Sequence, residues 1–132
     1  MYRLLPNLMI EARDPQSTLI RNIEGELDKI KSSNAYKGSR HLRKELKDVD
    51  KILGRILGRV GMGGHPGRGD VDEVAGAFED MIPEMIGLAD YEAARSKGED
   101  PETHSDPSND AAYEAAHRIA KALNDFVSRD RG

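Results

Sequence analysis

The chain has 132 residues and a formal net charge of −4; 33% of its residues are charged, 5% are aromatic, and it contains neither cysteine nor tryptophan. This length fits one domain with its own core, and the lack of cysteine excludes disulfides, thiol catalysis and cysteine-bound zinc. Because Ala, Leu, Glu, Lys and Arg outnumber the β-branched and aromatic residues that strands prefer, the composition predicts a single all-α domain over residues 1–132.

Residues 1–13 are interpreted as an extended arm whose apolar side chains are available to dock elsewhere. These side chains are Leu4, Leu5, Leu8, Met9 and Ile10. Pro6 interrupts the run and Glu11 follows it, so the segment lacks the pattern of a secretory leader. No apolar run approaches the ~20 residues of a membrane span. We therefore expect no membrane partner, and a location in the cytoplasm or within an intracellularly assembled particle.

The first helix is predicted over residues 14–33. Asp14 and Pro15 suit an N-cap followed by proline at the first helical position. Its apolar residues recur at alternating spacings of four and three, which predicts one buried face. They are Leu19, Ile23, Leu27 and Ile30. The polar stretch KSSNAYKGS (31–39) is predicted to be a connecting loop.

The second helix is predicted over residues 39–61, with Ser39 as its N-cap. Its apolar positions keep a heptad spacing for more than two heptads, which predicts a core-facing seam. The seam consists of Leu42, Leu46, Val49, Leu53, Ile56 and Val60.

A glycine-rich loop, GMGGHPGRG (61–69), is expected next because it cannot continue a helix. Asp70 and Glu73 then have the spacing of a capping box, and a third helix is predicted over residues 70–96. Its predicted buried residues are Val71, Val74, Phe78, Met81, Met85 and Leu88. Pro83 lies inside this helix and predicts a kink or break near Met81 and Ile82.

Residues 97–110 are interpreted as a polar, acidic linker, within which Asp106 and Pro107 repeat the cap-plus-proline start of the first helix. The fourth helix is predicted over residues 107–129. It is expected to bury Tyr113, Ala116, Ala120, Leu123 and Val127. Four amphipathic helices with matching seams predict a four-helix, bundle-like domain.

Charge is segregated along the chain. Residues 37–59 hold eight bases against three acids, a local charge of +5, whereas residues 70–110 hold thirteen acids against two bases, a local charge of −11. Such asymmetry indicates partners or assembly more than it indicates a fold.

The second helix also contains glycines opposite its seam, at Gly54, Gly58 and Gly61. Each costs about 1 kcal/mol of helix propensity relative to alanine. One interpretation is that the helix frays into the loop that follows. The other is that a neighbouring subunit or the N-terminal arm packs closely on this smooth face.

Basic residues on the far side of the same helix form a stripe of Lys44, Lys47, Lys51 and Arg55. A stripe of this kind is usually a solvated face, but it can also follow phosphates or meet an acidic protein. Aromatic residues that would stack on bases are lacking nearby. The acidic segment next to it would be repelled by anionic lipid, which argues against a membrane surface.

No combination of residues predicts catalysis. The glycine loop fits neither the Walker nor the dinucleotide spacing, and Glu114 with His117 is a lone pair of metal-ligand type where a di-iron bundle needs two. We therefore expect a non-enzymatic structural protein without cofactor or metal.

This protein is expected to form a homo-oligomer or part of a larger complex. The basic half of one subunit would meet the acidic segment of the next head to tail, an arrangement analogous to the rings of virion necks and connectors. The alternative is a protein that binds nucleic acid or an acidic partner through the basic face of helix 39–61.

Overall fold

The fold is given by a computed structural model, which describes residues 15–131. Within this range the chain is helical and contains no strand, so the predicted all-α class is confirmed. The elements in order are α2 (Pro15–Lys31), α3 (Asn34–Gly38), α4 (Arg40–Gly61), α5 (Arg68–Gly76), the π-helical turn η1 (Ala77–Met81), α6 (Ile82–Ser96) and α7 (Pro107–Arg131). No helix in this part of the chain is both long and apolar enough to cross a membrane. The predicted arm over 1–13 lies outside the described residues.

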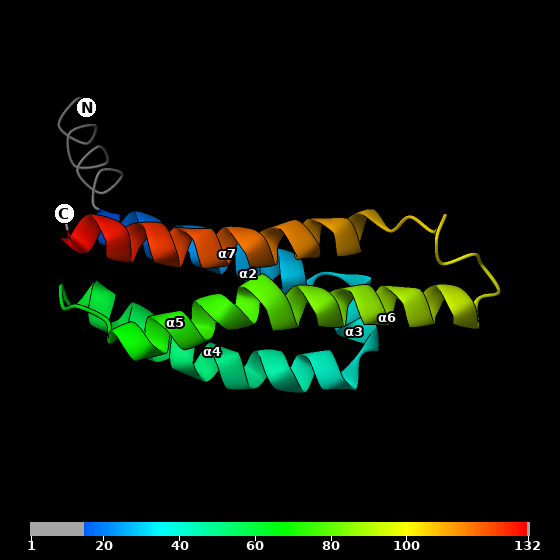
Figure 1. The fold of residues 1–132 in the computed structure, drawn as a ribbon, viewed down its shortest axis with the longest axis horizontal. Coiled ribbons are helices and arrows are strands. Elements are labelled where there is room, and N and C mark those ends of the chain that lie inside the picture. The colour runs from blue at the N-terminus through cyan, green and yellow to red at the C-terminus, as the bar shows by residue number, and fades with distance from the viewer. Residues whose placement is uncertain (1–14, 132) are drawn as a thin grey trace, which may run out of the picture.

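The helices lie roughly parallel or antiparallel to one another along the long axis (Figure 1). α5, η1 and α6 join into one rod between α7 and α4, and α2 packs mainly against α7. The glycine-rich loop and the end of α7 lie at one end of the molecule, and the linker before α7 lies at the other.

The core is aliphatic, as the composition predicted. All six predicted seam residues of α4 are buried, and so are the four of α2; Leu53 is only 1% exposed. They pack in one cluster with Phe78 of η1 and with the small residues of α7. The periodicity of these two helices was therefore sufficient to predict which of their faces is buried.

The third helix departs from prediction because η1 adds a residue to its turn. The N–H of Ile82 donates to the carbonyl of Ala77, a π-type bond. Beyond this turn the buried positions are shifted by one, so Ile82 and Ile86 enter the core. The prediction that Leu88 is buried is wrong, since it is 57% exposed.

The predicted disruption before Pro83 does occur, in the form of this π turn. Proline has no N–H to donate, and its ring clashes with the carbonyl four residues earlier in a regular α-helix. The wider turn of η1, which ends at Met81, relieves that clash while the rod continues. Pro83 itself is buried.

α7 uses alanines where it faces the rest of the molecule. Ala112, Ala115 and Ala116 are completely buried, whereas Tyr113 is 47% exposed, so the prediction that Tyr113 is buried is wrong. The tyrosine instead packs its ring edge-on against His117 at 4.8 Å between centroids. Small residues at the contact let α2 and α7 approach closely, and this leaves the large ring outside.

Serine hydroxyls cap the N-termini of α3 and α4. Ser33 accepts from the N–H of Tyr36 at the start of α3, and Ser39 accepts from the N–H of Leu42 at 3.1 Å, as predicted for the second helix. α3 itself lies in the stretch predicted to be a loop. The capping box predicted at Asp70 is wrong, because α5 begins at Arg68 after Gly67.

Candidate protein-interaction surface

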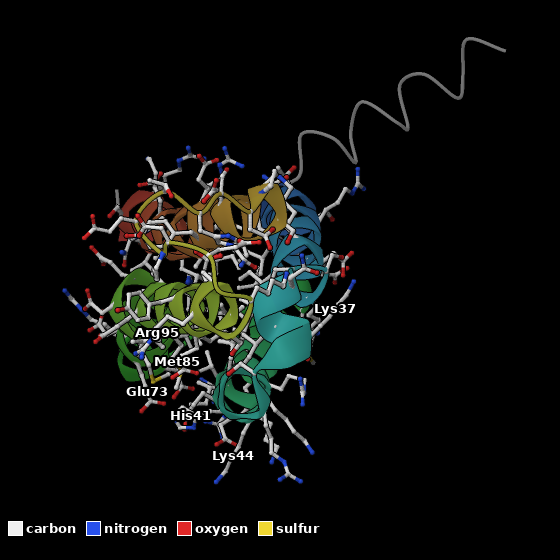
Figure 2. All side chains as sticks on the ribbon, turned by 90° about the vertical axis from the view of Figure 1, so that its right-hand side faces the viewer. Lys37, His41, Lys44, Glu73, Met85 and Arg95 are labelled. Atoms are coloured by element: carbon white, nitrogen blue, oxygen red, sulfur yellow. The ribbon has the colours of Figure 1, made fainter. Side chains whose placement is uncertain are left out.

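The outer face of α4 is basic. Lys44, Lys47, Lys51 and Arg55 are all exposed, on the side of the helix away from its buried seam. Figure 2 shows Lys44 projecting from α4 away from the rest of the molecule. Within residues 15–131 the three lysines form no ion pair, while Arg55 lies 3.8 Å from Asp70 of α5. Most of the stripe is thus free to meet another molecule.

The glycine stripe of α4 is open to its surroundings. Gly54 and Gly58 are exposed, and a Cβ built on either would meet no atom within 4 Å. A Cβ on Gly61 would lie 3.6 Å from Cδ1 of Ile20, an ordinary contact distance. The described chain therefore covers α4 on its inner side, and the predicted close neighbour on the outer side stays a prediction.

Exposed carboxylates gather on the rod formed by α5, η1 and α6. They are Asp72, Glu73, Glu79, Asp80, Glu84 and Glu92. The only basic residue of this rod beyond its first one is Arg95, which lies over the ring of Tyr91 at 5.9 Å. The acidic segment of the sequence is accordingly an acidic surface on an element separate from α4.

An apolar groove runs between α4 and the α5–η1 part of the rod, with a volume of about 420 Å³. Val49 and Ile52 of α4 line one side, and Val74, Ala77 and Met81 line the other. Its remaining lining residues are Asp48, Glu73, Gly76 and Asp80. Sequence reasoning missed this groove, because it lies beside the π turn that shifts the apolar pattern.

A polar cluster lies at the end of the molecule away from the glycine-rich loop, where the linker joins α7. His104 Nδ1 is paired with Glu99, and its Nε2 lies 3.5 Å from Oδ1 of Asp90. The His104 side chain is only 11% exposed. Ligand atoms of Asp90, His104 and Asp106 lie within 4.8 Å of one another, which places three residues of metal-ligand type together.

Hydrogen bonds already satisfy the carboxylates of this cluster. Asp106 accepts from the hydroxyl of Ser108 at 2.6 Å and from Nδ2 of Asn34 at 2.9 Å, and these bonds lower its pKa from 3.8 to about 2. Asp90 accepts from Asn109 at 2.7 Å. The geometry therefore fastens the linker to α3, α6 and α7, which is a structural role.

Comparisons with known proteins leave the surfaces to be interpreted from their own geometry. No protein-family model, curated protein or solved structure matches this chain. The predicted site residues all lie on α4, and all except Gly61, which faces Ile20 of α2, share its open outer side. The lysines lie toward the start of the helix and the glycines toward its end.

Proposed function

We propose that this chain is a non-enzymatic assembly protein whose copies associate head to tail. The outer face of α4, with its lysines and open glycines, contacts the acidic face of the α5–η1–α6 rod of the next copy. One observation carries the proposal: Lys44, Lys47 and Lys51 are exposed and have no ion-pair partner among residues 15–131, while exposed carboxylates gather on a different element. Complementary patches on different faces generate rings or filaments.

The glycines of α4 would add affinity that the charged residues alone do not provide. Exposed ion pairs contribute only about 0–1 kcal/mol each, so a basic stripe by itself gives orientation and fast encounter more than affinity. Without side chains at Gly54 and Gly58, a neighbouring backbone can approach α4 closely and add dispersion contacts. This combination suits a subunit of a larger particle, such as a connector-type ring.

A charge exchange tests this proposal directly. One variant carries Lys47→Glu and Lys51→Glu on α4, and a second carries Glu79→Lys and Glu84→Lys on the rod. All four positions are exposed, so folding should be retained, which circular dichroism checks. In light scattering, each variant alone should lose the association of the wild type. An equimolar mixture should regain it, because every contact in an alternating assembly again joins opposite charges.

The competing function makes the lysines a binding site for nucleic acid. That function predicts that the α4 variant associates normally but loses binding to duplex DNA, and that the wild-type affinity falls steeply with salt. Association that survives in both charge variants, or a wild type that is monomeric at every concentration tested, would overturn head-to-tail assembly.

A further inference from the structure

The apolar groove between α4 and the rod is built to receive apolar side chains. Its walls are the side chains of Val49, Ile52, Val74, Ala77 and Met81, and Gly76 leaves room between them. Three carboxylates, those of Asp48, Glu73 and Asp80, stand among the same lining residues. The groove therefore favours an apolar segment that carries positive charge at its edges.

We infer that this groove binds residues 3–13 of a second copy of the chain. That segment holds Leu4, Leu5, Leu8, Met9 and Ile10, whose aliphatic chemistry matches that of the groove walls. Leu4 and Leu8 are four residues apart, as are Leu5 and Met9, a spacing used when a peptide docks one face into a groove. The inference rests on the proposed self-association and names one of its contacts.

Charge complementarity supports this occupant. Arg3 directly precedes the apolar run of residues 4–10, and Arg13 follows it after Glu11, so residues 3–13 carry two bases and one acid. Bound in the groove, this segment would bring a net positive charge to a lining that contains the carboxylates of Asp48, Glu73 and Asp80. An acidic rim around an apolar floor selects against acidic segments, such as those of the linker before α7.

The arrangement of the helices favours a second copy over the same chain. α2, which follows this segment, packs mainly against α7, and neither α2 nor α7 contributes a residue to the groove. In Figure 2, Glu73 at the groove lies at the lower left, whereas α2 lies at the upper right. If residues 3–13 bound the groove of their own chain, they would have to reach across the molecule from the start of α2.

Cysteine cross-linking tests the inference cleanly, because the chain contains no cysteine of its own. Leu8→Cys and Gly76→Cys are made as separate full-length proteins and mixed under mild oxidation. A Cβ on Gly76 meets no atom within 4 Å, so the thiol can be placed in the groove without strain. The mixed disulfide dimer should form at least tenfold faster than with Gly87→Cys, an equally open glycine on α6 that does not line the groove.

A second variant closes the groove. Gly76→Leu should weaken association at least tenfold in light scattering, whereas Gly87→Leu and Gly76→Ala should leave it unchanged. Equal cross-linking at Gly76 and Gly87, or undiminished association of Gly76→Leu, would overturn the inference. An intrachain disulfide in a diluted Leu8→Cys, Gly76→Cys double variant would also overturn the inference, because residues 3–13 would then occupy the groove of their own chain.

These outcomes separate the inference from the function on which it rests. If Gly76→Leu still associates while the charge variants of α4 and the rod do not, the groove assignment fails and head-to-tail assembly stands. If the wild type itself is monomeric, the proposed assembly fails, and the groove assignment fails with it.

Discussion

Asn109, in the first turn of α7, donates a hydrogen bond of 2.7 Å from Nδ2 to Oδ1 of Asp90 on α6. Its amide oxygen accepts an equally short bond from the backbone N–H of Ala35 on α3. The residue is only 5% exposed. One side chain thus connects three helices at the end of the molecule where the linker returns.

Asn109→Ala should lower the free energy of unfolding by about 2–3 kcal/mol. The substitution leaves the N–H of Ala35 and a half-buried carboxylate without their partner, and unsatisfied groups of this kind cost about 1–3 kcal/mol each. Urea denaturation followed by circular dichroism measures the change. Asn124→Ala, on the exposed side of α7, should stay within about 0.5 kcal/mol of the wild type. An equal effect of the two substitutions would contradict the connecting role.

Asp106 should make the fold sensitive to acid. Its pKa is lowered from 3.8 to about 2, first by the hydroxyl of Ser108 and then by the amide of Asn34. A lowered pKa means that the carboxylate stabilises the fold fully above pH 3.8 and that this contribution is lost as the pH falls through about 2. Stability measured between pH 5 and pH 2 should therefore fall more steeply for the wild type than for Asp106→Asn.

The asparagine variant is a suitable control for Asp106 because asparagine is also a good N-cap. It removes the titrating group and keeps the start of α7. Ser108→Ala removes the largest cause of the lowered pKa, so its stability should depend less on pH in the same range. Parallel curves for all three proteins would show that Asp106 does not contribute to the pH dependence.

Leu53 should be among the most sensitive core positions. It is 1% exposed and lies in the middle of the α4 seam, so Leu53→Ala should cost about 2–5 kcal/mol through lost burial and the cavity that remains. Leu88→Ala, at a position that is 57% exposed, should cost less than about 1 kcal/mol. Thermal unfolding of the two variants compares them, and a cost below half a kcal/mol for Leu53→Ala would show that the seam does not carry the core.

Gly58→Leu tests the open stripe on α4. The structure leaves free space around an added Cβ, and leucine is the better helix former, so helix content should be kept or raised. If a neighbouring backbone packs on the stripe, the variant should lose association in size-exclusion chromatography. Gly25→Leu, an equally open glycine on α2, should not. An unchanged oligomer with a higher melting temperature would mean that the stripe faces solvent.

The local sequence pattern predicted the extent and the buried face of α4 almost completely. Its apolar seam is regular, and its N-cap is one serine, Ser39, which accepts from the N–H of Leu42. The ends of α2, α4 and α7, and the two outer ends of the α5–η1–α6 rod, lie within two residues of their predicted places, whereas α3 was not predicted. Within the third helix, the predicted buried face is displaced beyond Phe78, because the π turn moves the fully buried positions to Ile82 and Ile86 and leaves Met81 and Met85 only partly buried. Pro83 signalled a disturbance there but not whether the helix would break, bend or absorb a residue.

The candidate interaction surface could be predicted only in part from the sequence. The lysines and glycines share one side of α4 by simple helical periodicity, so their grouping followed from spacing alone. The groove depends on how α4 packs against α5 and η1, which local spacing does not give. The environment of His104 was also missed, because Asp90 is brought to it by tertiary packing and nothing in the local sequence indicates that contact.

The π turn also determines where the chain tolerates a change in its length. Removing one residue between 77 and 81 would convert the wide turn into an ordinary α-helical one and leave Val74 and Ile86 facing the same way. Removing one residue after Pro83 would instead rotate the rest of α6 by about 100° and carry Ala94 out of the core. η1 therefore resembles an α-helical turn into which one residue has been inserted. A relative that lacks this insertion should be one residue shorter here and keep the same core.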